Sequence, residues 1–260
     1  MNILLNGISG RMGREVVALC SSGYRGMSVR LGVDPRADET VIEAVRGFDE
    51  INGSYQIDCI VDFSHHSGVG EMLDFAVRRG IPTVIATTGH TEDELACIEA
   101  ASESIPIFFS ANMSLGVALL VELAKTAALA MPEAEIEIVE KHHNRKIDAP
   151  SGTALMLADA ICDVRPGAYI NSGRSGQGKR THEEIGIHAI RMGNIVGEHE
   201  VIIGTDNQTI TLKHEAHSRA LFAEGALAAA SFIVGKDAGL YNMNSLISEK
   251  SKRDTALSAN

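Results

Sequence analysis

The sequence predicts an α/β fold with two domains: an N-terminal doubly wound parallel sheet and a C-terminal α+β domain with a mixed or antiparallel sheet. Three observations support this prediction. The first half alternates short apolar runs with helix-period segments. A glycine-rich loop joins the first apolar run to the first helix. Beyond Met131 the pattern changes to alternating apolar and polar stretches separated by turn residues.

In the first half, the apolar runs predict parallel strands, and the amphipathic segments predict helices that cover the sheet. The predicted strands are Ile3–Leu5, Ser28–Val33, Ile57–Phe63, Pro82–Ala86 and Ile105–Ser110. The predicted helices are Arg11–Ser21, Gly70–Arg79, Thr91–Ser102 and Leu115–Met131. The third helix is expected to begin at Thr91 because Thr91 and Glu94 have the spacing of a capping box.

In the second half, alternation predicts strands that are joined in part by short turns. These strands are Glu135–Lys141, Ile187–Arg191, Glu198–Ile203 and Gln208–His214. Two helices are expected, over Thr153–Cys162 and Ser218–Val234. The glycine-rich, basic segment Asn171–Thr181 is predicted to be a mobile loop.

Composition excludes several classes of function. The chain of 260 residues carries 23 basic and 34 acidic side chains, a net charge of −11, and 4% of its residues are aromatic. Such a chain is unsuited to nucleic acid, because its surface repels phosphates and offers few stacking platforms. The start of the chain is not that of a secretory signal, and no apolar run is long enough to span a bilayer, so we expect a cytoplasmic protein with no membrane partner. The four widely spaced cysteines predict free buried thiols and no zinc site.

The loop Gly7–Gly13 lies between the first predicted strand and the first helix, which is the context of a dinucleotide-binding, Rossmann-like fingerprint. Glycines let the backbone approach a pyrophosphate, and the helix N-terminus supplies N–H donors. The spacing G-x-x-G-x-x-G departs from the usual G-x-G-x-x-G, so a tight turn without a ligand is the alternative. Asp34 ends the second predicted strand 21 residues after Gly13, where an acid that binds ribose is expected. Together these features predict nucleotide binding.

A second informative segment follows the predicted strand Glu135–Lys141. Five of the six residues from Lys141 to Lys146 can carry positive charge. The alternative is a solvated charge run, but this one follows a strand and precedes a helix that begins at Pro150-Ser151-Gly152-Thr153. A helix N-terminus beside cations predicts a site for a carboxylate-bearing substrate. The adjacent histidines raise the question of a metal, but no third ligand stands at suitable spacing, so we expect none.

These motifs resemble those of the dihydrodipicolinate reductase (4-hydroxy-tetrahydrodipicolinate reductase) family. The resemblance includes the run Glu137–Ala154 and the G-x-x-G-R-M-G form of the glycine loop. Further similar stretches are Ala86–Gly89, Phe109–Ser114, Ile195–His199 and Ser218–Phe222, in the family's order along nearly the whole chain.

The resemblance implies a reductase of the diaminopimelate route to lysine, which transfers hydride from NADH or NADPH to a cyclic dicarboxylate to give tetrahydrodipicolinate. By this analogy His142 donates the proton and Lys146 is a second acid that anchors the substrate. Substrate binding is assigned to His143, Ser151, Gly152 and Thr153. Cofactor binding is assigned to Gly7, Ile8, Ser9, Gly10, Arg11, Met12, Asp34, Ala86, Thr87, Thr88, Ser110, Ala111, Asn112 and Met113. Independently of the analogy, hydride addition to a conjugated C=C–C=N unit requires a proton, which histidine can supply near neutral pH.

The resemblance also implies a domain division and an assembly. Residues 1–113 and 220–260 would form the dinucleotide-binding domain, and residues 114–219 would form the substrate-binding domain and build a homotetramer. Three positions depart from common family residues. Ala86 replaces a glycine, Met113 replaces an aromatic residue, and Pro35 follows Asp34 where some members carry arginine. Since Asp34 favours ribose hydroxyls over a 2′-phosphate, NADH is expected to be preferred and NADPH accepted.

Two other functions compete with this reading. An oxidoreductase acting on an amino-acid semialdehyde would need a nucleophilic cysteine, but Cys59 and Cys97 lie in apolar patterns. A silent nucleotide sensor would have no use for the carboxylate site that His142, Lys146 and the Ser-Gly-Thr turn predict.

Overall fold

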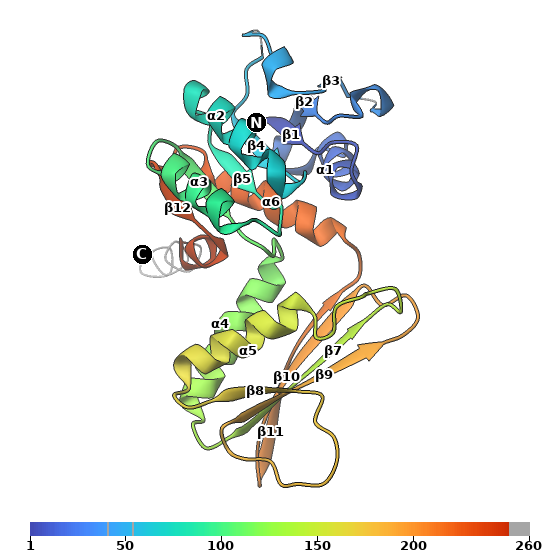
Figure 1. The fold of residues 1–260 in the computed structure, drawn as a ribbon, viewed down its shortest axis with the longest axis vertical. Helices are drawn as coiled ribbons and strands as arrows, with labels where there is room; N and C mark the ends of the chain where they lie inside the picture. The colour runs from blue at the N-terminus through green and yellow to red at the C-terminus, as the bar shows by residue number, and fades with distance from the viewer. Residues whose placement is uncertain (41, 54, 250–260) are drawn as a thin grey trace, which may run out of the picture. The chain divides into compact units, whose positions relative to one another are not determined.

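The computed structural model describes residues 1–40, 42–53 and 55–249, which divide into two compact units (Figure 1). Unit 1 comprises Met1–Ser114 together with the chain from Arg219 onward, and unit 2 comprises Leu115–Ser218. These boundaries lie one residue from the expected division at 113/114 and 219/220. The two-part α/β architecture is as predicted.

Unit 1 contains a seven-stranded sheet in which every pairing is parallel. Its strands are β1 (Asn2–Asn6), β2 (Ser28–Val33), β3 (Ala44–Val45), β4 (Cys59–Asp62), β5 (Thr83–Ile85), β6 (Pro106–Phe109) and β12 (Gly239–Tyr241). The order is β12-β6-β5-β4-β1-β2-β3, so the strand order reverses between β4 and β1. Ligands of doubly wound sheets bind outside the carboxyl ends of the strands at such a switch point.

Helices pack on the two faces of this sheet, as the doubly wound pattern predicts. They are α1 (Arg11–Ser21), α2 (Val69–Arg79), α3 (Glu92–Ser102) and α6 (Ala220–Ile233). Helix α1 contacts α6, and α2 contacts α3; Figure 1 shows α2 and α3 in front of the strands and α6 behind them. The predicted capping box is present at Thr91, where the Thr91 side chain accepts from the Glu94 N–H.

Unit 2 contains a five-stranded mixed sheet of order β11-β10-β7-β9-β8. Its strands are β7 (Glu135–His142), β8 (Tyr169–Ser172), β9 (Glu184–Arg191), β10 (Gly197–Thr205) and β11 (Gln208–Ala216). Strand β10 is antiparallel to both β7 and β11, whereas β9 is parallel to both β7 and β8. The sheet is therefore mixed, one of the two predicted forms.

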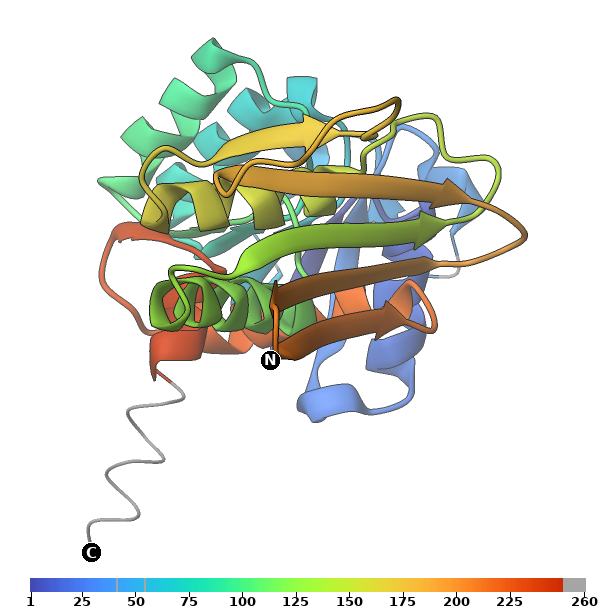
Figure 2. The same cartoon turned by 90° about the horizontal axis from the view of Figure 1, so that it is seen from below.

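Helices α4 (Leu115–Ala130) and α5 (Gly152–Val164) cover one face of this sheet. Alternation along β7 sends Ile136 and Ile138 into the core against these helices. Figure 2 looks onto the opposite face, which none of the described helices of unit 2 crosses. That face carries charged side chains: Lys141, for example, forms ion pairs with Glu198 at 3.1 Å and Glu200 at 3.2 Å.

Several elements differ from the predictions. Strands β3, β8 and β12 were not predicted, because runs of two to four residues are too short to show alternation. Strand β8 takes Asn171 and Ser172 from the expected mobile loop. Cys97 is exposed although buried thiols were expected, because it lies on the outer face of α3. None of the helices within the described ranges has the length and apolar character needed to cross a membrane.

Candidate active site

The glycine loop follows β1 and lies at the switch point, where its backbone packs closely against the backbone that follows β4 and against itself. Gly7 has φ of 83°, and a Cβ there would lie 2.5 Å from the Phe63 carbonyl oxygen. A Cβ at Gly13 would lie 2.3 Å from the Gly7 carbonyl oxygen. Gly10 is the N-cap of α1 and has no side chain to occupy the first-turn N–H groups. The loop therefore presents the positive end of α1 to an anion, as a pyrophosphate site requires.

Asp34 directly follows β2, and its carboxylate is turned toward the glycine loop. One oxygen, Oδ2, accepts from the Ser9 N–H at 3.1 Å, and the other, Oδ1, accepts from the Arg36 N–H at 2.9 Å. Burial by itself raises the pKa of Asp34, but hydrogen bonds from Ser9 and Arg36 lower it overall. The carboxylate is thus ionised at neutral pH. Each oxygen retains a lone pair for a further donor.

The other predicted cofactor segments follow the carboxyl ends of β5 and β6. The Ala86 N–H donates to the Asp62 carbonyl oxygen, and the Ser110 N–H donates to the Ile85 carbonyl oxygen. All predicted cofactor segments therefore lie along one edge of the sheet. Ile8 and Met113 are buried, each with 2% of its surface exposed.

A cavity of about 290 Å³ adjoins the glycine loop. The predicted residues Ile8 and Ser9 line it together with Arg14, Val17, Ala18, Thr40 and Ile42, which sequence reasoning did not identify. Arg14 is three residues after Arg11 on the same side of α1. This helical spacing was the signal in the sequence that could have identified Arg14.

A buried polar cluster at the ends of β1 and β4 was also not predicted. Asp62 is 1% exposed and accepts from Asn6 Nδ2 at 2.8 Å and from Ser64 Oγ at 2.6 Å. Burial raises the pKa of Asp62, although its hydrogen bonds oppose that shift. The available signal was that two neighbouring apolar strands each end in a polar residue.

In unit 2, the predicted catalytic residues lie at and just beyond the end of β7. His142 is the last residue of β7 and is 9% exposed. Lys146 Nζ lies 2.8 Å from Asp148 Oδ1, and Arg145 Nη2 donates to Asn194 Oδ1 at 2.6 Å. His143 is held by its N–H, which donates to the Ile195 carbonyl oxygen. A loop carrying three basic side chains thus follows directly on His142.

The predicted Ser-Gly-Thr turn forms the N-terminus of α5, where Gly152 and Thr153 occupy the first turn. Ser151 is the N-cap, is 2% exposed, and its Oγ accepts from the Ala154 N–H. The same Oγ lies 3.1 Å from His199 Nε2. The Ser151 hydroxyl thus has two protein partners, and the alternative to its predicted role in binding a substrate carboxylate is a structural role as the cap of α5.

Glu140, Arg191 and His199 also belong to this cluster, and sequence reasoning did not identify them. Glu140 is 0% exposed and lies 2.6 Å from His142 Nδ1, measured from Oε2. Both terminal nitrogens of Arg191 donate hydrogen bonds to the Glu140 carboxylate. Burial by itself raises the pKa of Glu140, but hydrogen bonds from Arg191 and His142 lower it overall. The available signal was the alternation of β7, which puts Glu140 on the same face as the buried isoleucines.

His199 on β10 packs its ring against His142, with ring centroids 5.2 Å apart in a T-shaped arrangement. Burial and then the neighbouring His142 lower the pKa of His199 to about 4. His199 is therefore uncharged at neutral pH and does not repel a protonated His142. Among the described residues, no group of three or more His, Cys, Asp or Glu side chains is arranged to hold a metal ion.

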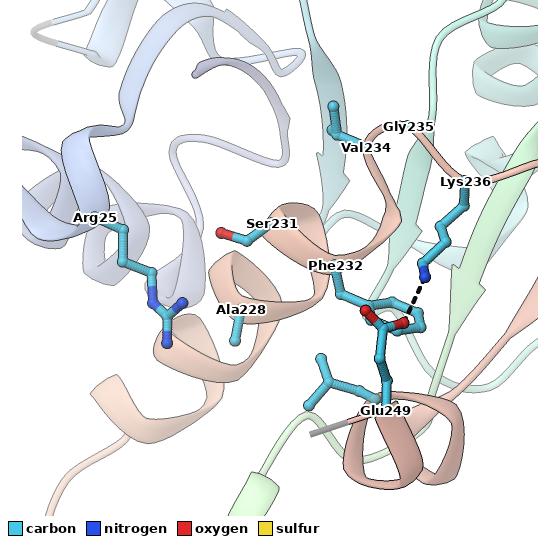
Figure 3. A pocket seen from close by; sticks show the side chains of 9 residues that line it. Arg25, Ala228, Ser231, Phe232, Val234, Gly235, Lys236 and Glu249 are labelled. Atoms are coloured by element: carbon cyan, nitrogen blue, oxygen red, sulfur yellow. Dashed lines mark hydrogen bonds and ion pairs between the residues drawn. The ribbon is translucent and has the colours of Figure 1, made fainter. Parts of the chain in front are cut away.

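A separate cavity of about 330 Å³ lies beside α6 in unit 1 (Figure 3). None of the residues predicted to bind cofactor or substrate lines it. Lys236 Nζ donates to Glu249 Oε2 and lies 4.8 Å from the centroid of the Phe232 ring. The ammonium is thus engaged within the protein.

Comparison with known proteins covers both units. Residues 1–113 match the model of the N-terminal region of dihydrodipicolinate reductase, and residues 116–247 match that of its C-terminal region. The 4-hydroxy-tetrahydrodipicolinate reductase of Caldanaerobacter subterraneus subsp. tengcongensis is 44% identical over 249 residues, covering 95% of this chain and 98% of the relative. The enzyme of that name from Clostridium tetani is 43% identical over 251 residues, covering 95% and 97%.

Among solved structures, the fold is similar to that of the dipicolinate-bound dihydrodipicolinate reductase from Paenisporosarcina sp. TG-14. The TM-score is 0.79 at 22% identity, and the similarity covers 93% of this chain and 97% of that one.

Proposed function

Since the chain belongs to the dihydrodipicolinate reductase family, we propose that it reduces 4-hydroxy-tetrahydrodipicolinate, or the dihydrodipicolinate formed from it, to tetrahydrodipicolinate in the diaminopimelate route to lysine. The observation that carries this proposal is the cluster in unit 2. There, His142 precedes a basic loop, and Glu140 links it to the N-terminus of α5 by bonding to both His142 Nδ1 and the Ser151 N–H. A proton donor beside two sources of positive charge suits reduction of a dicarboxylate.

Family membership and the fold of unit 1 imply a nicotinamide cofactor. The residues present fit such a group, because the glycine loop has no room for side chains at Gly7 and Gly13 and presents the α1 N-terminus. When bound, the reduced cofactor supplies the hydride. We assign its pyrophosphate to the Gly7–Met12 segment and its adenosine ribose to Asp34. The segments 86–88 and 110–113 would contact the rest of the molecule.

On the substrate side, Lys146 and His143 would pair with the carboxylates. The N–H groups of the first turn of α5, at Gly152 and Thr153, would donate to one of these carboxylates. Ser151 supports this turn as its cap. His142 donates a proton to the carbon skeleton after hydride addition, and Lys146 stabilises the developing negative charge.

The role of His142 is tested with His142→Gln. We expect kcat to fall about 100-fold, the usual scale for one positioned acid, while KM changes little because other groups hold the carboxylates. Lys146→Ala should instead lower kcat and raise KM together, since its ammonium contacts charge in both ground and transition states. Cofactor Kd, measured by fluorescence, should be unchanged in both variants. A near-normal kcat for His142→Gln would contradict its assignment, and a large rise in cofactor Kd would place Lys146 at the pyrophosphate.

We propose that NADH is preferred over NADPH. The ionised Asp34 suits ribose hydroxyls and repels a 2′-phosphate, and Pro35 adds no cation. Arg36, with its side chain 58% exposed, is the cation next along the chain that could pair with the phosphate. Because that contact is screened, NADPH should carry a penalty of about 1 kcal/mol, which is roughly fivefold in kcat/KM.

The cofactor preference should widen at high salt, because screening weakens the attraction of Arg36 for the phosphate. Measuring kcat/KM with both cofactors at low and high ionic strength checks this. Better use of NADPH at both salt concentrations would refute the assignment of Asp34.

We further propose that the protein is cytoplasmic and forms a homotetramer through the face of the unit 2 sheet that its helices leave uncovered. The charges on this face, from Lys141, Glu198, Glu200 and Lys213, include both signs, so a second copy can meet them with opposite charges. Light scattering on the purified protein should give four times the chain mass. A monomer would contradict the assembly without affecting the assigned chemistry.

A further inference from the structure

Glu140 is a fully buried carboxylate whose two oxygens accept four hydrogen bonds. Arg191 donates from Nη1 to Oε2 at 2.8 Å and from Nη2 to Oε1 at 2.6 Å. The Ser151 N–H donates to Oε1 at 2.9 Å. The fourth contact is His142 Nδ1 to Oε2 at 2.6 Å. Removing the charges of such a pair from water costs free energy, and hydrophobic residues at the same positions often stabilise a fold equally well. The presence of this pair therefore points to a role besides stability.

The fold presents these groups from three separate elements. Glu140 and His142 are two residues apart on β7, so their side chains lie on the same face of the sheet. Arg191 stands directly opposite His142 in the parallel register of β7 and β9. Ser151 caps α5, and Arg191 also donates to the Asp148 carbonyl oxygen at 2.7 Å. Both terminal nitrogens of Arg191 are thus held by hydrogen bonds.

The contact with Glu140 determines which nitrogen of His142 carries the proton. A carboxylate that is kept ionised accepts only, so Nδ1 must be the N–H donor. The second nitrogen, Nε2, is left for chemistry. Gly197 on β10 lies beside it, and a Cβ at that position would come within 3.1 Å of Nε2. Glycine at position 197 therefore places no side chain against Nε2.

We propose that Glu140 is the positioning residue of the proton donor, holding His142 in the Nδ1–H form with Nε2 directed to the substrate, while Arg191 keeps Glu140 ionised. This inference rests on the proposed function, in which His142 is the donor. In the reaction, the Nε2–H bond breaks and its electron pair stays on Nε2. The proton forms a C–H bond with the electron pair that hydride addition leaves on the substrate. His142 ends as the neutral Nδ1–H tautomer, and Glu140 accepts the same hydrogen bond throughout.

The charged or titratable groups around His142 and the adjoining His199 come from several elements. Glu140 lies on the same strand as His142, and Arg191 on β9 bonds to Glu140. Near His199 on β10 are His214 on β11 and Lys146, which pairs with Asp148 in the loop that follows β7. Glu140 is the one that contacts the imidazole through a hydrogen bond and carries negative charge. Its removal should therefore affect a protonated His142 more than any other single change.

The test is a double-mutant cycle of Glu140→Gln and His142→Gln. Glutamine keeps the shape of Glu140 but not its charge. Alone, Glu140→Gln should lower kcat about 10- to 100-fold with KM within about threefold. In the wild type kcat is expected to fall at high pH, and in Glu140→Gln the midpoint of this fall should lie about one pH unit lower. In the His142→Gln background, Glu140→Gln should change kcat less than about threefold, because residues that act as a unit are not additive.

Glu184→Gln is the matched control, since Glu184 is also a buried carboxylate bonded to an arginine, Arg174, but lies at the opposite end of β9 from Arg191. It should leave kcat and the pH profile unchanged. If Glu140→Gln leaves Arg191 uncompensated and fails to fold, Glu140→Gln/Arg191→Met removes both charges and should fold with kcat still low. Recovery of wild-type kcat in that variant would show a structural role only and overturn the proposal.

A second readout does not depend on activity. Nitrogen-15 NMR of labelled histidine should show His142 as the Nδ1–H tautomer in the full-length protein and a loss of that preference in Glu140→Gln. An Nε2–H tautomer in the wild type, or fully multiplicative losses of kcat in the double mutant, would refute the positioning role. A near-normal kcat in His142→Gln alone would refute the proposed function instead, so the two failures are distinguishable.

Discussion

The Ser151 hydroxyl offers a prediction that separates a structural role from substrate binding. Its Oγ caps α5 by accepting from the Ala154 N–H and contacts His199 Nε2, and the side chain is buried. Ser151→Ala removes both contacts with almost no change in volume. We therefore expect a loss of stability in unit 2 and a small effect on substrate KM.

The magnitude follows from the two contacts. Loss of an N-cap costs about 1 kcal/mol. A buried His199 Nε2 left without its partner costs about 1–3 kcal/mol more. The free energy of unfolding of unit 2 should thus fall by about 2–4 kcal/mol, which lowers its melting temperature by on the order of 10 °C.

Differential scanning calorimetry of the intact protein measures this change, and two control variants calibrate it. Thr91→Ala removes a cap in the exposed capping box of α3 and should cost about 1 kcal/mol. Thr126→Ala removes an exposed hydroxyl on α4 of the same unit and should be nearly neutral. If Ser151→Ala melts like Thr126→Ala while substrate KM rises more than tenfold, the hydroxyl binds substrate and its structural role is refuted.

Two further predictions concern stability, each measured by urea denaturation. The pKa of His199 is about 4 in the folded protein and about 6.5 in the unfolded chain. As pH falls, the unfolded chain therefore binds this proton at a higher pH than the folded protein does. Stability should therefore decrease as pH falls from about 6.5 to 4, by about 3 kcal/mol, and level off below; His199→Gln should flatten that slope. A Cβ at Gly225 in α6 would lie 1.7 Å from the Met113 carbonyl oxygen, whereas Gly70 in α2 has open space. Gly225→Ala should cost about 3 kcal/mol and Gly70→Ala should gain about 0.5 kcal/mol, and equal effects would contradict this packing.

The parts of the fold and site that sequence predicts are those encoded locally. Helix α1 and strand β2 have the predicted bounds because their apolar periodicity is unbroken. The glycine loop and Asp34 were found because strand, loop, helix and acid follow one another within 35 residues. His142 and Lys146 were found by their charge and by the family resemblance. Their roles remain predictions.

What sequence did not predict depends on register between distant strands. Arg191 meets Glu140 across 51 residues of chain, and His199 meets Ser151 across 48. In the sequence, Glu140 is one of several acids in an alternating strand. The alternation of β7 places this acid on the buried face, but only the pairing of β7 with β9 and the position of α5 show that it is ionised and directed at His142.

The most direct test of the central claim is isotope transfer by the purified protein. NADH with both hydrogens at C4 of the nicotinamide replaced by deuterium, incubated with 4-hydroxy-tetrahydrodipicolinate and the wild-type protein, should yield tetrahydrodipicolinate carrying one deuterium on carbon. The His142→Gln variant should form the same labelled product about 100-fold more slowly. Oxidation of NADH without deuterium in the product, or no oxidation at all under conditions where the cofactor binds, would contradict the assignment of this chain as a reductase of that substrate.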